Sequence, residues 1–255
     1  MFVKICGVTT AEDALLAAGL GADAVGLNFV DSSPRRISAT RASSIVEQLP
    51  SEVLTVGIFR NELKERVVEI SNAVGLRAVQ LHGHETPEDS RWIGERVPAL
   101  IKVFAVKDPA LQAGGDYGPH RLLIDSPLPG SGEVFDWTLL EQALKGRSYI
   151  LAGGLNPTNV AQAIEMLAPW GVDVASGVES SPGRKDPAKV RRFIAAARAA
   201  ADSIDYSHTN RDDEFSEPVP SPMLRSAADN RDGLSVEPAS GDNPQIQPFD
   251  WEENQ

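Results

Sequence analysis

The feature that most constrains the fold is a regular alternation of short apolar runs with helical patterns over the first ~200 residues. The predicted strands are Phe2–Cys6, Ala24–Phe29, Leu54–Phe59, Ala78–Leu81, Ile101–Ala105, Leu122–Ile124, Tyr149–Ala152 and Val172–Ala175. The predicted helices are Thr10–Ala18, Ala39–Gln48, Glu62–Val74, Pro87–Arg96, Trp137–Leu144, Pro157–Leu167 and Pro187–Ala200. Strands separated by helices pair in parallel through right-handed crossovers, so the pattern predicts a parallel sheet.

Eight strands with this rhythm over about 200 residues predict a compact (β/α)8 TIM barrel. The alternative is an open doubly wound sheet, which would be expected to carry a Gly-x-Gly-x-x-Gly turn after its first strand. The run Cys6-Gly7-Val8-Thr9-Thr10 stands at that position and lacks this fingerprint. We therefore predict one barrel domain over residues 1–201.

The composition changes after residue 201. From Asp202 to Gln255 there are 13 acidic and 3 basic residues, which account for −10 of the net charge of −12. This segment has scattered prolines and no apolar periodicity, so it cannot bury enough surface to offset its ordering entropy. We predict a disordered acidic tail over residues 202–255. Its aromatic-containing end, Pro248–Glu253, is either part of a solubilising tail or a docking motif for an unknown protein partner.

Composition also limits the cellular setting and the partners. No run approaches the roughly 18 apolar residues of a membrane span, and the N-terminus lacks a secretory signal. A single cysteine allows no internal disulfide and fits a reducing cytoplasm. The negative net charge argues against non-specific nucleic-acid binding, and cysteine and histidine are too few for a usual structural zinc site.

Polar residues follow most of the predicted strands. Because the C-terminal ends of barrel strands converge on one mouth, we expect these side chains to meet there. In chain order they are Cys6, Asn28 with the loop Asp31–Arg36, Arg60, Gln80 with His82, Asp125, Gly153 with Gly154, and Asp173 with Ser176 and Gly177.

Two of these loops predict a phosphate site. In Gly153–Pro157, the paired glycines allow backbone N–H groups to approach an anion, Asn156 is a candidate N-cap, and Pro157 suits the first helical position. The alternative is that Gly-Gly is only a tight turn. Loops after the seventh and eighth strands form the recurrent phosphate site of such barrels. The predicted donors are Gly153, Gly154, Asn156, Ser176 and Gly177.

The ionisable candidates each have two interpretations. Cys6 is either a small buried hydrophobe or a base whose pKa is lowered by a cationic mouth. Asp125 is either a loop cap or an acid whose pKa is raised by partial burial. Either Arg35 or Arg36 can pair with a substrate carboxylate, the other being solvated. His82 is a structural hydrogen-bonding group or a site residue, and its spacing does not decide which.

Several motifs, taken in order, resemble the phosphoribosylanthranilate isomerases. They are Lys4–Thr9 followed by Glu12–Ala14, Gly21–Gly26, Ser33–Arg35, Val79–Gly83, Leu123–Ser126, Gly130–Gly132 before Phe135–Trp137, Ala152–Val160, and Val172–Asp186. The resemblance runs from about Phe2 to Ala200 and leaves the tail without a counterpart. Asn28 and Pro129 depart from the usual family pattern.

The resemblance implies an isomerase of tryptophan biosynthesis that acts without metal or cofactor. It would convert N-(5′-phosphoribosyl)anthranilate to the carboxyphenylamino-deoxyribulose phosphate by an Amadori rearrangement. By the same likeness Cys6 would be the general base, Asp125 the general acid, and Arg35 the group that holds the anthranilate carboxylate. Gln80, His82 and Asp173 match other positions around the family's pocket.

Three alternatives remain. An indole-glycerol-phosphate synthase would want a catalytic lysine at several strand ends, whereas only Lys4 and Lys102 lie inside predicted strands. A histidine-pathway isomerase would more naturally place aspartate where Cys6 stands. A catalytically idle barrel would act as a scaffold through its acidic tail, although the presence of both Cys6 and Asp125 counts against it.

Overall fold

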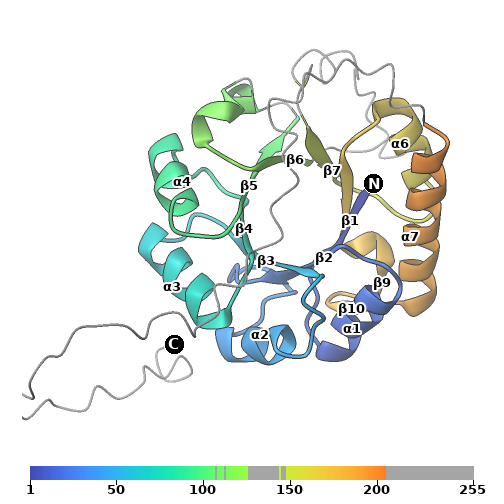
Figure 1. The fold of residues 1–255 in the computed structure, drawn as a ribbon, viewed down its shortest axis with the longest axis horizontal. Coiled ribbons are helices and arrows are strands. Elements are labelled where there is room, and N and C mark those ends of the chain that lie inside the picture. The colour runs from blue at the N-terminus through green and yellow to red at the C-terminus, as the bar shows by residue number, and fades with distance from the viewer. Residues whose placement is uncertain (107, 112, 126–143, 145–147, 205–255) are drawn as a thin grey trace, which may run out of the picture. The chain divides into compact units, whose positions relative to one another are not determined.

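The computed structural model describes residues 1–106, 108–111, 113–125, 144 and 148–204, and its centre is a closed barrel of eight parallel strands (Figure 1). Each strand pairs with the next in sequence, and β8 closes the ring on β1. The strands are β1 (Phe2–Ile5), β2 (Ala24–Asn28), β3 (Leu54–Phe59), β4 (Ala78–Leu81), β5 (Leu100–Ala105), β6 (Arg121–Asp125), β7 (Tyr149–Ala152) and β8 (Gly171–Val174). The predicted TIM barrel is confirmed.

Helices surround the strand ring (Figure 1). They are α1 (Ala11–Gly19), α2 (Ala39–Val46), α3 (Lys64–Val74), α4 (Pro87–Gly94), α6 (Val160–Leu167) and α7 (Pro187–Asp202). Short 3-10 helices are η1 (Pro109–Leu111), η2 (Gly114–Tyr117) and η3 (Ser176–Val178), and a hairpin of β9 (Glu179–Ser181) and β10 (Arg184–Lys185) precedes α7. No helix in the described ranges is long and apolar enough to cross a membrane.

The predicted helices are confirmed except that one begins later than predicted and another lies almost wholly outside the described residues. Asn156 does not cap α6, which begins at Val160 after Asn159. The Asn156 side-chain Oδ1 instead accepts a hydrogen bond from the Thr158 backbone N–H at 2.8 Å, and the backbone N–H of Asn156 donates to Asn159 Oδ1 at 2.8 Å. These hydrogen bonds form a turn, and the helix therefore begins three residues after the predicted start at Pro157. The helix predicted at 137–144 lies outside the described residues except for Leu144, as does the tail from residue 205.

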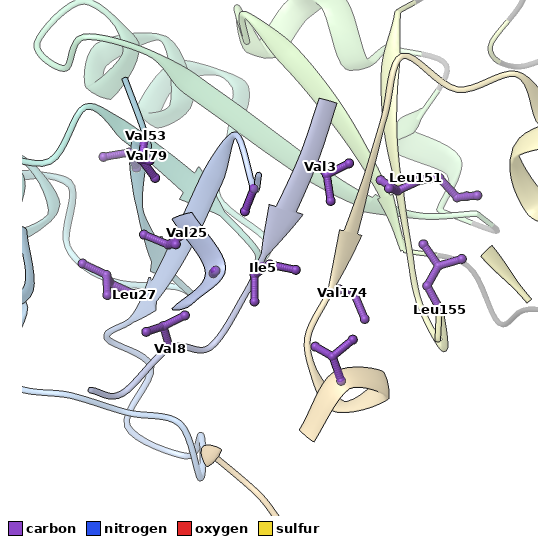
Figure 2. Close-up of a cluster of buried hydrophobic side chains, with 14 of the residues drawn as sticks. Val3, Ile5, Val8, Val25, Leu27, Val53, Val79, Leu151, Leu155 and Val174 are labelled. Atoms are coloured by element: carbon purple, nitrogen blue, oxygen red, sulfur yellow. The ribbon is translucent and has the colours of Figure 1, made fainter. Parts of the chain in front are cut away.

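Alternation along the strands separates two apolar layers. One layer contains only strand residues and their immediate neighbours, among them Ala24, Val56, Ala78, Val103, Leu123 and Ile150, and it fills the barrel interior. The other layer packs the outward-facing side chains against the helices. Figure 2 shows part of it, including Val3, Ile5, Val25, Leu27, Val79, Leu151 and Val174.

The alternation of inward and outward side chains along each strand determines which polar side chains the barrel encloses. Because Val3 and Ile5 face outward, the intervening Lys4 faces inward, and the same rule turns Gln80 and Asp173 inward. All three are buried. The interior therefore carries charge directly beneath the mouth where the site residues were predicted.

Candidate active site

Cys6 follows β1 and is buried at the mouth of the barrel. Its N–H donates to the carbonyl of Val174 in β8 at 2.8 Å, which fixes the strand end. Gly26 of β2 provides the room for its side chain, because a Cβ at Gly26 would lie 2.8 Å from Cys6 Sγ. The sulfur therefore has a defined position against the barrel wall.

The electrostatic surroundings of Cys6 differ from one of our expectations. One of our two interpretations of Cys6 was a base whose pKa is lowered by a cationic mouth, the other a small buried hydrophobe. Burial instead raises the pKa above its ordinary value, and this effect outweighs the opposing influence of Lys4 and Lys185. The Asp173 carboxylate raises the pKa further. Lys4 and Lys185 act to lower the pKa of Cys6, so formation of a thiolate that could serve as a base depends on these cations.

Asp125 lies at the end of β6, three places from β1 around the eight-stranded ring, so it faces Cys6 across the mouth. Its carboxylate Oδ2 is 3.4 Å from Nε2 of His82, which follows β4. The side chains of Asp125 and His82 are 44% and 41% exposed, so the carboxyl is more open than our partial-burial interpretation assumed. The contact with Asp125 favours the site interpretation of His82 over a purely structural one.

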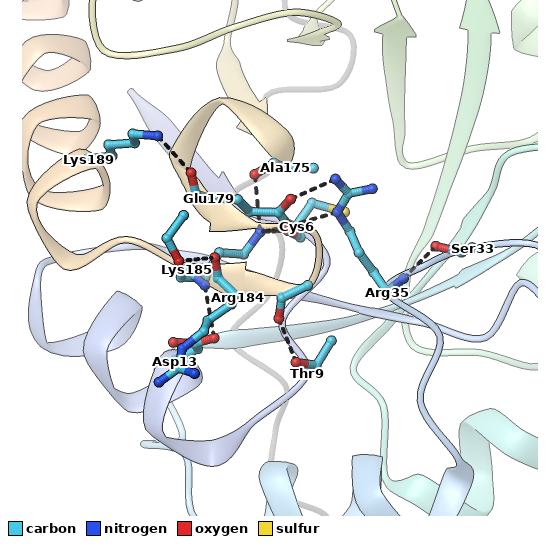
Figure 3. Close-up of polar contacts among 12 residues, drawn as sticks. Cys6, Thr9, Asp13, Ser33, Arg35, Ala175, Glu179, Arg184, Lys185 and Lys189 are labelled. Atoms are coloured by element: carbon cyan, nitrogen blue, oxygen red, sulfur yellow. Dashed lines mark hydrogen bonds and ion pairs between the residues drawn. The ribbon is translucent and has the colours of Figure 1, made fainter.

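Arg35 lies against the mouth and is held by a carboxylate of the protein (Figure 3). Its Nε and Nη2 donate to the two carboxylate oxygens of Glu179, both at 2.7 Å. These hydrogen bonds raise the pKa of Arg35. Gly7 allows the close passage of the side chain, because a Cβ there would lie 2.3 Å from Arg35 Cδ. Arg36, by contrast, is exposed and pairs with Asp31.

Lys185 joins this cluster from β10. Its Nζ donates to Glu179 Oε1 at 3.0 Å and to the carbonyl oxygens of Cys6 at 2.6 Å and Ala175 at 3.1 Å. Burial lowers the pKa of Lys185, partly offset by the Glu179 charge. Burial also acts to raise the pKa of Glu179, but the hydrogen bond from Arg35 and the Lys185 charge outweigh it and lower that pKa. The ends of β1 and β8 are thereby tied to one buried ion-pair cluster.

Sequence reasoning missed the roles of Glu179 and Lys185. A local signal was available in Ser181-Pro182-Gly183-Arg184, because Pro followed by Gly is typical of a type II turn and Gly183 has φ +78°. That turn brings β10 back along β9, which is how Lys185 reaches Glu179. What the side chains contact beyond the hairpin depends on the closed barrel.

The loops after β7 and β8 meet at the predicted phosphate site. Gly153 and Gly154 have φ of +93° and +60°, a left-handed conformation that glycine adopts without strain. Their N–H groups donate no hydrogen bond to another described residue. Gly177 lies so close to the first loop that a Cβ on it would be 1.9 Å from the carbonyl oxygen of Leu155. Two sets of backbone donors thus lie side by side.

Three further residues complete the description of the mouth. Gln80 is buried inside the barrel, and its Oε1 has no hydrogen-bond partner among the described residues. Asp173 accepts a hydrogen bond from Lys4 Nζ at 3.0 Å. Asn28, which departs from the family pattern, uses its Oδ1 to accept from the N–H of Val30 at 2.8 Å and so caps its own loop. Pro129 lies outside the described residues.

A closed parallel barrel with a thiol and a carboxyl across its C-terminal mouth, beside paired glycine-rich loops, defines a (β/α)8-barrel enzyme. A family model described as N-(5′-phosphoribosyl)anthranilate (PRA) isomerase matches residues 3–196. The N-(5′-phosphoribosyl)anthranilate isomerase of Citrifermentans bemidjiense is 47% identical over 203 residues, covering 78% of this chain and 98% of that protein.

Solved structures agree with these relatives. Phosphoribosyl anthranilate isomerase from Thermotoga maritima matches with a TM-score of 0.72 and 42% identity, covering 78% of this chain and 99% of that one. Another phosphoribosyl anthranilate isomerase was solved in complex with reduced 1-(o-carboxyphenylamino)-1-deoxyribulose 5-phosphate; it matches with a TM-score of 0.70 and 40% identity, over 78% and 99% of the two chains. The chain belongs to the N-(5′-phosphoribosyl)anthranilate isomerase family, the isomerases of tryptophan biosynthesis.

Proposed function

We propose that the chain converts N-(5′-phosphoribosyl)anthranilate to its aminoketose phosphate with Cys6 as general base and Asp125 as general acid. The observation that carries these assignments is the placement of the two groups on opposite sides of one mouth, at the ends of β1 and β6. The substrate is a closed aminoribofuranose, so an acid is needed at its ring oxygen and a base at C2′. A barrel mouth with both groups can act on the two faces of the sugar.

The proton transfers balance in three steps. Asp125 gives a proton to the ring oxygen, the C1′–O bond breaks, and the nitrogen lone pair forms an iminium with C1′. The Cys6 thiolate then takes the C2′ proton, and the released electron pair forms the C1′–C2′ double bond while neutralising the nitrogen. The enol proton returns to the Asp125 carboxylate and the Cys6 thiol protonates C1′, which gives the ketose and restores both groups to their starting states. Each positioned proton transfer contributes about 10²–10⁴-fold.

Binding groups at the two ends of the substrate would hold it between acid and base. Arg35 uses its Nε and Nη2 for Glu179, and the outer Nη1/Nη2 edge of a guanidinium still has donors for a second carboxylate. We assign that edge to the anthranilate carboxylate. The N–H groups of Gly153, Gly154, Ser176 and Gly177 are assigned to the phosphate, whereas the backbone N–H of Asn156, predicted to join them, donates to Asn159 Oδ1. Gln80, His82 and Asp173 are assigned to the pocket between the two ends of the substrate.

Loss of anthranilate-type fluorescence on mixing the full chain with freshly made phosphoribosylanthranilate tests the activity. The expected result is catalytic turnover, and a folded chain without turnover would overturn the proposal. Arg35→Ala and Arg36→Ala form a matched pair for the binding assignment. Arg35→Ala should raise KM at least about tenfold, because a charged hydrogen-bond pair is removed, whereas Arg36→Ala should leave KM nearly unchanged. The reverse order would reassign the carboxylate contact.

We also propose that the enzyme works in the cytoplasm, which the single cysteine supports, and that the acidic segment 202–255 is a separate tail with its own protein partner. Deleting residues 205–255 should leave kcat and KM unchanged. Loss of turnover on deletion would show that the segment belongs to the catalytic unit. An inactive full chain would instead favour the scaffold alternative.

A further inference from the structure

The interior of the barrel holds an ion pair directly beneath Cys6. Lys4 is fully buried, and its Nζ donates to Asp173 Oδ1 at 3.0 Å. The two residues are register partners in β1 and β8. Lys4 and Cys6 are two residues apart on the same strand, so both side chains point to the interior face.

Stability alone does not account for this pair. The surrounding interior is built of apolar side chains such as Val56, Ile101 and Leu123. In such a setting, replacing a buried ion pair with well-packed apolar residues is often neutral or stabilising, because desolvation cancels the attraction between the charges. A charged pair retained in an apolar layer next to a reactive group therefore points to a role in the chemistry.

Among the residues that the structure describes, four charged groups face Cys6: Lys4 from β1, Asp173 from β8, Lys185 from β10 and Arg35 from the loop after β2. Lys185 directs its ammonium to three protein acceptors, which is the number of N–H bonds it has. Arg35 directs its Nε and Nη2 to Glu179. Lys4 donates to one carboxylate oxygen and keeps further donors for the thiol side of the pair.

We propose that Lys4 is the positioning residue that makes Cys6 a base, by stabilising its thiolate from below, and that Asp173 limits this effect by holding the same ammonium. The inference rests on the proposed role of Cys6. The charge and hydrogen bonding of Lys4 act to lower the pKa of Cys6, while Asp173 acts to raise it. Burial would otherwise lower the pKa of Lys4, but Asp173 and Cys6 together raise it, so the ammonium stays charged.

The single cysteine of the chain allows the thiol to be titrated without background. The rate of Cys6 alkylation by iodoacetamide is measured against pH in the full chain, with no substrate present. The midpoint of this profile reports the thiol–thiolate equilibrium, because the thiolate is the form that reacts. If burial slows access of iodoacetamide equally at every pH, the maximal rate falls but the midpoint does not move.

Two variants should move the midpoint in opposite directions. Lys4→Met removes the facing cation, so the midpoint should move to higher pH and alkylation at pH 7 should slow by roughly tenfold. Asp173→Asn removes the competing anion and should move the midpoint to lower pH. A disturbance of packing would not produce opposite shifts. The acid limb of the pH profile of kcat/KM should follow the alkylation midpoint in each variant.

Lys102→Met is the matched control, because it also removes a strand lysine from a buried pair, with Glu85 at 2.6 Å, but that pair lies outside the barrel interior. It should leave the Cys6 midpoint unchanged. An unchanged or lowered midpoint in Lys4→Met would overturn the proposal. If Lys4→Met fails to fold, an unchanged or raised alkylation midpoint of Cys6 in Asp173→Asn would overturn the proposal. If Cys6→Ala keeps normal turnover, the proposed function fails independently of these shifts.

Discussion

Replacing Gly177 with alanine tests the contact between the two loops assigned to the phosphate. The new Cβ would lie 1.9 Å from the carbonyl oxygen of Leu155 and 3.0 Å from the Cβ of Asn156. Both neighbours belong to the loop after β7, and the nearest atom is backbone, so no side-chain rotation relieves the overlap. One of the two loops must move by about 1 Å or more to restore an ordinary van der Waals distance.

The expected cost follows from this displacement. Overpacking of this kind ordinarily lowers the free energy of unfolding by about 1–3 kcal/mol. A misplacement of about 1 Å in a positioning contact can reduce activity about 10²-fold, so kcat/KM should fall by roughly that factor. Inorganic phosphate, tested as a competitive inhibitor, should bind more weakly to Gly177→Ala than to the wild type.

Gly115→Ala is the control, because a Cβ at Gly115 would meet nothing within 4 Å. It should retain the kcat/KM and the phosphate inhibition of the wild type. Steady-state kinetics and a melting curve of each variant provide the readouts. If Gly177→Ala folds with unaltered kcat/KM and unaltered phosphate inhibition, the loops after β7 and β8 do not form the anion site and the assignment is refuted.

Two other predictions concern the position of the Cys6 thiol and the acid sensitivity of the fold. Gly26→Ala would place a Cβ 2.8 Å from Cys6 Sγ, so kcat should fall at least about tenfold as the thiol is displaced, measured by the fluorescence assay. The pKa values of Glu85 and Glu179 lie below the ordinary range, because cations outweigh burial. The unfolded state therefore binds more protons as pH falls through about 4–5, and the melting temperature should decline below about pH 5 while staying nearly level above it.

Controls separate these effects from general perturbation. Gly19→Ala introduces a Cβ with nothing within 4 Å at the end of α1 and should leave kcat unchanged. Removal of both partners of one buried pair in Glu85→Gln/Lys102→Met should reduce the acid sensitivity, whereas Glu52→Gln at an exposed position should not. Normal turnover in Gly26→Ala, or a melting temperature that stays level down to pH 4, would contradict the corresponding argument.

The barrel was predictable from the sequence because its signal is local and repeated. Leu54–Phe59, Ala78–Leu81 and Tyr149–Ala152 have the predicted bounds, since all their residues except the partly buried Leu54 are buried between the barrel interior and the helices. The α6 start was wrong because the Asn156 side chain competes for the backbone groups of the turn. That competition depends on side-chain geometry and not on helical periodicity.

The candidate site was predictable only in part. Strand-end position identified Cys6, Asp125 and the glycine loops, because a barrel brings all C-terminal strand ends together. The Lys4–Asp173 pair and the Arg35–Glu179 contact join residues 169 and 144 positions apart in the chain. Both pairings depend on closure of the ring, which no local pattern specifies, although a local turn signal was available for the hairpin before α7.

The central claim is that Cys6 takes the C2′ proton while Asp125 supplies the ring-opening proton. The most direct test compares turnover of phosphoribosylanthranilate by the full chain with turnover by Cys6→Ala and Asp125→Asn, each shown to fold by its melting curve. We predict a loss of at least about 10²-fold in kcat for each variant, the lower bound for one proton transfer. Near-normal turnover in either folded variant would contradict the role of that residue.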